Sequence, residues 1–416
     1  MSRLRNIIFL VLIACLPINL GKHFITSYSY ISGIVVDYLV PTVYLQDILV
    51  GLLLTLWLLD PYKSKINWTK NSVLISLFFF SVSCFLSFLV SGLPQLSVIY
   101  FIRILFAVLL VFYVNAEYGK DFTVDNLLKV LALSVIFISL LGIAQFVNQG
   151  SIFNNYLFLG EQPYSSNNKS ILKENVLGNY VIPPYSLFRH PNTFAGFLTL
   201  CLFFIFAMWK TKKGYIYWLS LSLGSCCLLL SLSVVAFIAF LVGILIWVLY
   251  KNGKPVYVYT CYFVTVTLLF GFSIPAFKDI SFIQQIPSIY RRVELMINGY
   301  RVLPHYIPFG IGLGTSTSLY IHSVFLSRDF SFFQPVHNIF MLLLVECGLL
   351  SFIFLLLMFF FLLKRSRINI YGLIFIAQIA VLGSFDHYLL TMHQTLYLFM
   401  LLVGVTLATS DLLAKK

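Results

Sequence analysis

NIFMLLLVECGLLSFIFLLLMFFFLL, the segment at residues 338–363, contains one charged residue, Glu346, and is followed at once by Lys364, Arg365 and Arg367. An α-helix rises about 1.5 Å per residue, so about 20 apolar residues cross a hydrocarbon core about 30 Å thick. Basic residues gather at the cytoplasmic ends of membrane helices. The segment therefore predicts a membrane-spanning helix whose carboxyl end is cytoplasmic.

Similar apolar runs recur along the whole chain. Hydrophobic residues make up 60% of it and charged residues 10%, whereas soluble domains are about 25% charged. We therefore expect an all-α polytopic membrane protein with about 12 transmembrane helices. The expected spans lie at roughly 5–20, 42–59, 71–91, 96–115, 126–148, 192–209, 214–232, 233–250, 256–275, 338–363, 368–386 and 394–412.

Lysine and arginine are distributed unequally between the two sets of loops that these spans define. Every short loop on one side carries at least two of them. The positive-inside rule makes that side cytoplasmic, so both termini are expected inside and the long connecting segments outside the cytoplasmic (inner) membrane. The net charge of +13 arises from these short clusters. It therefore indicates a lipid bilayer as partner and no nucleic acid.

The spans and loops divide the chain into four parts. Residues 1–150 are expected to form an N-terminal transmembrane bundle of about five spans, and residues 151–191 an external loop. Residues 192–363 are expected to form a core that includes a second long external loop, 276–337, and residues 364–416 the C-terminal spans. Loops of this length in a compact bundle are usually functional, so both external loops are candidates for the site.

The second external loop contains one stretch with helical periodicity. Its apolar residues and its polar residues fall on opposite faces, which predicts an amphipathic helix lying at the membrane surface. Pro304 and Pro308 are expected to end it. The apolar face holds Ile289, Val293, Met296 or Ile297, and Tyr300, and the polar face holds Arg291, Glu294, Asn298 and Arg301.

External cations beside an apolar bundle suit an anionic ligand whose tail stays in lipid. Arg189, Arg291 and Arg292 lie in external segments, and His337 lies just before a span. Guanidinium groups grip phosphate oxygens in a fork, and a histidine titrates near neutrality and can take a proton from a hydroxyl. A diphosphate carried on a polyprenol is such a ligand.

Other charged residues have simpler interpretations. Arg103, inside the fourth span, is expected to pair with a carboxylate or to extend to the interface. Asp386, His387 and His393 border the last external turn, and they are interpreted as interfacial polar residues because their spacing offers too few ligands for a metal. No metal and no other cofactor is expected.

Several short motifs, in this order, resemble the O-antigen ligase and O-antigen polymerase (Wzy-type) superfamily of bacterial envelope glycosyltransferases. Taken singly they are weak, but their order, spacing and external placement together are fairly specific, and the resemblance covers about 188–363. The motifs are Phe188-Arg189-His190-Pro191-Asn192-Thr193-Phe194-Ala195-Gly196, Arg292-Val293-Glu294-Leu295, Pro308-Phe309-Gly310-Ile311-Gly312, His337-Asn338 and Glu346-Cys347-Gly348.

The resemblance implies metal-independent transfer of a glycan from an undecaprenyl-diphosphate-linked donor to a hydroxyl of a glycan, lipid or protein acceptor outside the membrane. It implies that His337 orients or deprotonates the acceptor, and that Arg292 and Arg189 hold the diphosphate. Gly310 and Gly312 would let the backbone approach the ligand. The remaining implied roles are substrate binding for Arg291 and Asn338 and support for Glu346 and Asn192.

One position departs from the family pattern. Members commonly carry an arginine where this chain has Val234, so Arg291 is a candidate substitute, or transfer activity is weakened. Ligation, polymerisation and protein O-glycosylation all stay open within the family. Two other hypotheses also stay open: a flippase that moves lipid-linked glycan, and a non-catalytic relative that acts in polysaccharide assembly.

Overall fold

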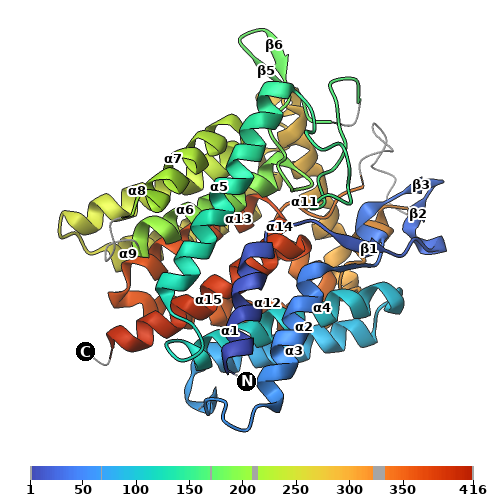
Figure 1. The fold of residues 1–416 in the computed structure, drawn as a ribbon. Helices are drawn as coiled ribbons and strands as arrows, with labels where there is room; N and C mark the ends of the chain where they lie inside the picture. The colour runs from blue at the N-terminus through green and yellow to red at the C-terminus, as the bar shows by residue number, and fades with distance from the viewer. Residues whose placement is uncertain (1, 67, 169–170, 209–213, 322–332, 415–416) are drawn as a thin grey trace.

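Every predicted apolar run forms a helix in the computed structural model, which describes residues 2–66, 68–168, 171–208, 214–321 and 333–414 (Figure 1). Seven of the basic residues that define the charge asymmetry of the loops lie outside the described residues: Lys169, Lys210, Lys212, Lys213, Arg328, Lys415 and Lys416. The helices that match the runs are α1 (Ser2–Cys15), α2 (Leu45–Leu59), α3 (Ser72–Leu89), α4 (Pro94–Glu117), α5 (Val124–Asn148), α6 (Pro191–Met208), α7 (Tyr215–Leu230), α8 (Val234–Lys251), α9 (Val256–Ser273), α12 (Ile339–Arg365), α13 (Ile370–Phe385) and α15 (His393–Leu413).

The length and composition of these helices indicate a multi-pass membrane protein. Among the described residues, 7 helical segments are long and apolar enough to cross a bilayer, and α2, α6, α7 and α13 are shorter apolar helices. The prediction of an α-helical membrane protein is therefore confirmed. The finer prediction of twelve crossings stays a prediction, as does the orientation of the termini.

Small polar side chains join the central helices. Helix α12 packs along α3, where Ser87 donates a hydrogen bond to the carbonyl of Glu346 (2.6 Å) and Ser351 donates one to Ser83 (3.0 Å). Such residues are favoured between membrane helices because they allow close packing and satisfy polar groups away from water. Helix α15 packs against α4, and α13 against α8 and α9, which completes the apolar core.

Short strands lie toward the end of the bundle opposite the N-terminus (Figure 1). The predicted span at 42–59 begins too early, because Thr42–Tyr44 is a strand and α2 starts at Leu45. Three antiparallel pairs form: β1 (Gly21–His23) with β4 (Thr42–Tyr44), β2 (Tyr30–Ile31) with β3 (Ile34–Val35), and β5 (Glu174–Val176) with β6 (Asn179–Val181). The short helices are η1 (Ser27–Ser29), η2 (Asp37–Leu39), η3 (Trp68–Lys70), η5 (Ile274–Phe277), α10 (Ser281–Gln285), η6 (Ser316–Ile321), η7 (Ser366–Ile368) and α14 (Tyr388–Thr391).

The helix predicted in the second external loop is α11 (Pro287–Tyr306), and it differs from the prediction in two respects. It runs through Pro304 and ends only before Pro308, and Asn298, predicted on the polar face, is buried. Both faces of α11 are packed: Val293 and Met296 are buried near α12, and Leu295 packs with Ile31, Leu39 and Leu96. The helix is thus held between α12 and the first external segment.

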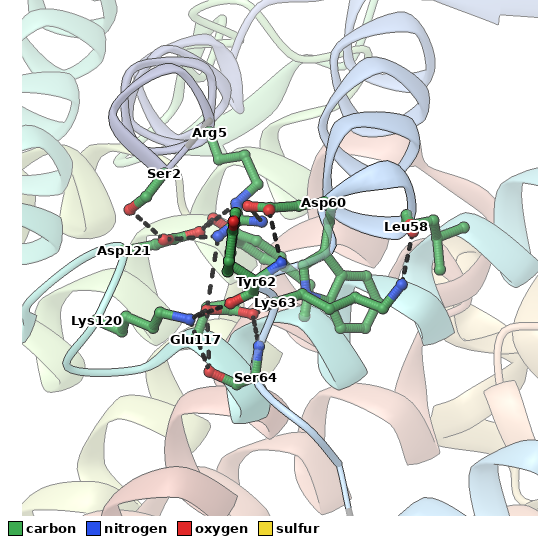
Figure 2. Close-up of polar contacts among 12 residues, drawn as sticks. Ser2, Arg5, Leu58, Asp60, Tyr62, Lys63, Ser64, Glu117, Lys120 and Asp121 are labelled. Atoms are coloured by element: carbon green, nitrogen blue, oxygen red, sulfur yellow. Dashed lines mark hydrogen bonds and ion pairs between the residues drawn. The ribbon is translucent and has the colours of Figure 1, made fainter.

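Two buried charge clusters tie the helices together. Arg103 of α4 pairs with Asp47 of α2 (Nη2–Oδ2, 2.9 Å), which confirms the expected carboxylate partner, and the hydroxyl of Tyr397 also donates to Asp47 (2.7 Å). At the N-terminal end, Arg5 is fully buried among the carboxylates of Asp60, Glu117 and Asp121 (Figure 2). Each arginine is held by carboxylates from other segments, so each cluster links its helices through charge-assisted hydrogen bonds.

Candidate functional site

A polar cavity of about 340 Å³ opens at the end of the bundle opposite the N-terminus. It is bordered by segments that precede or follow the membrane helices, so residues far apart in the sequence meet there. Of the described residues, those that line it are Asp37, Tyr38, Gln162, Ile171, Tyr185, Arg189, His190, Asn192, Thr193, Gln334, His337, Asp386, His387 and Met392.

His337 enters the cavity from the residue pair that starts α12. Asn338 caps this helix, because its side-chain oxygen accepts hydrogen bonds from the backbone N–H groups of Phe340 (2.9 Å) and Met341 (3.0 Å). The Asn338 amide nitrogen donates to the carbonyl of Ser384 (3.1 Å), so this side chain is occupied in positioning His337. The Nδ1 of His337 lies 3.1 Å from the carbonyl oxygen of Pro335, which can only accept. Nδ1 therefore carries a proton, and Nε2 of the neutral ring holds a free lone pair.

Asp386 and His387, which follow α13, stand beside His337. The rings of His337 and His387 meet edge to face with centroids 4.7 Å apart. The carboxylate of Asp386 accepts the backbone N–H of His387 (2.8 Å) and lies 3.6 Å from the guanidinium of Arg292. The Nε of Arg292 is buried and has no hydrogen-bond partner among the residues that the structure describes. The structure thus brings together the two predicted catalytic residues, with Asp386 between them.

Arg189 borders the cavity from the segment before α6. Its guanidinium donates to the Tyr44 hydroxyl (3.1 Å) and lies 3.6 Å from the carboxylate of Asp37. Its Nε, like that of Arg292, is buried without a hydrogen-bond partner in the described part of the chain. A buried N–H group without an acceptor is costly, and an anion with several oxygens would satisfy it.

Burial and the neighbouring charges shift the pKa values of the cavity's titratable groups. Burial lowers the pKa of His337 to about 3 and that of His190 to about 4, although Asp386 opposes both shifts. The pKa of His387 is also lowered, by burial and then by Arg292. Burial raises the pKa of the Asp386 carboxyl, but His337, His387 and Arg292 together outweigh it and hold the pKa below its ordinary value. The lining of the cavity thus combines neutral imidazoles with the side chains of Asp37, Asp386 and Arg189, and Arg292 lies beside Asp386.

These shifts predict that the protein loses stability in mild acid. The unfolded-state pKa of histidine is 6.5, so the unfolded chain takes up protons below that pH before His337 or His190 does. The contribution of these two histidines to the free energy of unfolding is complete above pH 6.5. It is lost as the pH falls toward the folded-state pKa values. At about pH 5 the loss is about 2 kcal/mol for each histidine. We expect the unfolding temperature in detergent to fall from neutral pH to about pH 5, and to fall less in the double variant His190→Gln/His337→Gln. Equal pH dependence in both proteins would contradict this.

The same cluster contains the donor types of a metal centre. One ligand atom each from His337, Asp386 and His387 lie within 4.8 Å of one another. The prediction of too few ligands at the last turn was therefore wrong, because it counted only sequence neighbours and did not include His337. However, Arg292 already balances the Asp386 carboxylate, and its positive charge opposes a divalent cation there. His393 is not a member, since its ring stacks on Tyr44 with centroids 3.5 Å apart.

The predicted glycine turn lies elsewhere and supports α12. Gly310 and Gly312 are not among the described residues that line the polar cavity. Gly312 donates its N–H to the carbonyl of Glu346 (3.0 Å), and the Glu346 carboxylate accepts the N–H groups of Gly314 (2.9 Å) and Ser316 (3.2 Å). Gly310 has φ +72°, and a Cβ there would lie 2.3 Å from the Glu346 backbone. These glycines are therefore required by close packing, and Gly310 also borders a second cavity of about 430 Å³.

The remaining sequence predictions divide between the cavity and its surroundings. Asn192 lines the cavity, whereas Arg291 is not among its described lining residues. Val234, at the position of the family arginine, is 69% exposed at the start of α8. Sequence reasoning assigned no role to the lining residues Asp37, Tyr38, Gln162 and Gln334. Asp37 could have been noticed in the sequence as a charged residue in the segment between the first two apolar runs.

No protein-family model matches the chain, and a search of curated proteins finds no match. The fold and the cavity define a class, a multi-pass helical membrane protein with a polar cavity lined by histidine, aspartate and arginine at one end of its bundle. The resemblance carried by the motifs stays a prediction.

Proposed function

We propose that the chain transfers a glycan from an undecaprenyl-diphosphate-linked donor to an acceptor hydroxyl on the external face of the cytoplasmic membrane. The observation that carries this proposal is that Arg189 and His337 line one polar cavity, while Arg292 lies 3.6 Å from the cavity residue Asp386. Among the described residues, the buried Nε–H of each guanidinium group has no hydrogen-bond partner, and the contact of His337 Nδ1 with the Pro335 carbonyl leaves the lone pair on Nε2. Twelve crossings with both termini inside would put this cavity at the outer surface.

The chemistry is a displacement at the anomeric carbon of the donor. The acceptor oxygen attacks that carbon, its proton passes to Nε2 of His337, and the bond from the carbon to the diphosphate oxygen breaks. The electron pair of that bond stays on the diphosphate, whose charge Arg189 and Arg292 stabilise. The negative charge of a bound diphosphate would raise the low pKa of His337 toward the reaction pH.

The position of the cavity also suits a lipid-linked substrate. The polar cavity lies where α6, α12 and α13 end or begin, so a diphosphate can occupy it while a polyprenol lies along the exposed apolar helices. Ligation, polymerisation and protein glycosylation require the same chemistry at the donor and differ in the acceptor. The proposal therefore covers the class of reaction and leaves the acceptor to experiment.

A flippase is the second candidate, because carriers often hold ionisable pairs among their helices. Arg103 and Asp47 form such a pair. Asp47 also accepts hydrogen bonds from Tyr397 and from the backbone of Tyr44. A carboxylate held by this many donors acts as a fixed structural link, which favours the transferase.

The proposal is tested with the full chain in liposomes, undecaprenyl diphosphate carrying a labelled glycan, and a mixture of lipid and glycan acceptors. We expect labelled product to form, including in the presence of a chelator. Leaflet exchange of the donor without a new glycosidic bond would overturn the proposal in favour of the flippase.

Arg292→Lys and Arg189→Lys are each expected to lower transfer about 10²-fold, because lysine keeps the charge but loses the fork that binds two phosphate oxygens. Arg301→Lys, on the exposed side of α11, is the matched control. If both site variants transferred glycan at the rate of the control, Arg189 and Arg292 would not be part of the site.

A further inference from the structure

His190 is a cavity residue for which the reaction described so far has no use. It immediately precedes α6, lines the cavity beside Arg189, and its ring lies near that of Tyr185. Within the described part of the chain, no hydrogen bond is formed by its Nε2. The residue therefore has an uncommitted nitrogen in the place where the donor would bind.

One backbone contact determines the tautomer of His190. The N–H of Asn192 donates to Nδ1 of His190 (3.1 Å). A backbone amide can only donate, so Nδ1 holds the lone pair and the single proton of the neutral ring lies on Nε2. His337 has the opposite arrangement, because its Nδ1 donates to the carbonyl of Pro335. The cavity thus offers one Nε2 that donates and one Nε2 that accepts.

The surroundings of His190 keep it in the neutral form and favour an anion beside it. Burial and the charge of Arg292 lower its pKa to about 4 in spite of Asp386. The first turn of α6 adds the positive end of a helix, which favours negative charge at the same place. A neutral imidazole of this kind keeps its Nε2 proton at physiological pH and can give a fixed hydrogen bond.

We propose that His190 donates its Nε2–H as a hydrogen bond to the diphosphate oxygen that leaves the anomeric carbon. The inference rests on the proposed transfer reaction and adds a second polar group to it. The acceptor's proton goes to His337, the electron pair of the broken bond goes to the diphosphate oxygen, and the proton of His190 stays on its nitrogen. His190 thereby stabilises negative charge in the transition state without acting as an acid.

Two amide substitutions separate this role from helix capping. Glutamine at position 190 carries an N–H near the place of Nε2, so His190→Gln should keep the donor. Asparagine carries its oxygen near the place of Nδ1, so His190→Asn should keep the acceptor for the Asn192 N–H but lose the donor. His190→Leu loses both groups.

The experiment measures kcat and KM for transfer of labelled glycan by the full chain in liposomes, together with the unfolding temperature of each variant. We expect kcat for His190→Gln to stay within about tenfold of the wild type, and kcat for His190→Asn and His190→Leu to fall about 10²–10³-fold. A merely structural role predicts the reverse order, with asparagine retaining activity and glutamine losing it. That order, or wild-type kcat in all three variants, would overturn the inference. Absence of transfer by the wild type would instead refute the proposed function.

Discussion

Replacing His337 by glutamine is expected to lower the rate of glycan transfer by about 10²–10⁴-fold, the usual contribution of a positioned general base. Glutamine has a similar size but no basic nitrogen, so the acceptor hydroxyl would have to lose its proton to water. The cap formed by Asn338 is independent of the ring, because it uses the backbone of Phe340 and Met341. The variant should therefore fold, and the loss should appear in kcat.

Two further measurements separate proton transfer from donor binding. Binding of undecaprenyl diphosphate in nanodiscs should change little in His337→Gln, since the arginines provide most of the attraction for the diphosphate. His305→Gln is the matched histidine control, because His305 is exposed at the end of α11 and borders the second cavity. A transfer rate in His337→Gln equal to that of His305→Gln would show that His337 takes no part in the reaction.

The helices were predictable from sequence because their cause is local. Each long apolar run is a property of consecutive residues, and each formed a helix near its predicted position. The structure differs from the prediction where another interaction overrides the local pattern. Thr42–Tyr44, for example, pairs with Gly21–His23 as strands instead of extending α2. Helix α11 continues through Pro304 because packing on both of its faces holds it.

The site was only partly predictable, because its members come from segments that no local pattern connects. His337 and Arg292 belong to motifs in one region of the chain, but Asp386, which lies between them, follows a different helix and belongs to no motif. Asp37 meets Arg189 only through the fold of the first external segment. The glycine turn illustrates the opposite difficulty, since Gly310 and Gly312 have the composition of a ligand loop although their backbone packs on α12.

The buried ion pairs of Arg5 allow a direct test of how α1 packs in the fold. Its side chain is fully buried, with Nε 2.6 Å from Asp121 and Nη1 2.6 Å from Asp60, and Glu117 lies 3.7 Å away (Figure 2). These contacts join the start of α1 to the ends of α2 and α4. Trp57 and Ser64 donate further hydrogen bonds to Glu117. Arg5 is therefore the cation around which acidic residues from the end of α2, the end of α4 and the turn after α4 are arranged.

Arg5→Met is expected to destabilise the protein by about 3 kcal/mol, because it leaves the buried carboxylate of Asp121 without its cation and Glu117 with only the half-exposed Lys120. This is the lower end of the range for a broken buried pair, since the cluster lies at the end of the bundle, near water. The measurement is the free energy of unfolding in mixed micelles. Arg3→Met, two residues earlier and exposed, is the matched control and should change stability by less than about 0.5 kcal/mol.

A second substitution distinguishes lost charge compensation from lost packing. If the unpaired carboxylates cause the instability, Asp121→Asn in the Arg5→Met background should recover part of the lost stability, because it removes one of the buried negative charges. If the lost volume of the guanidinium were the cause, the second change would add to the first. Additive losses, or an Arg5→Met variant as stable as Arg3→Met, would show that the buried cluster does not hold α1 against α2 and α4.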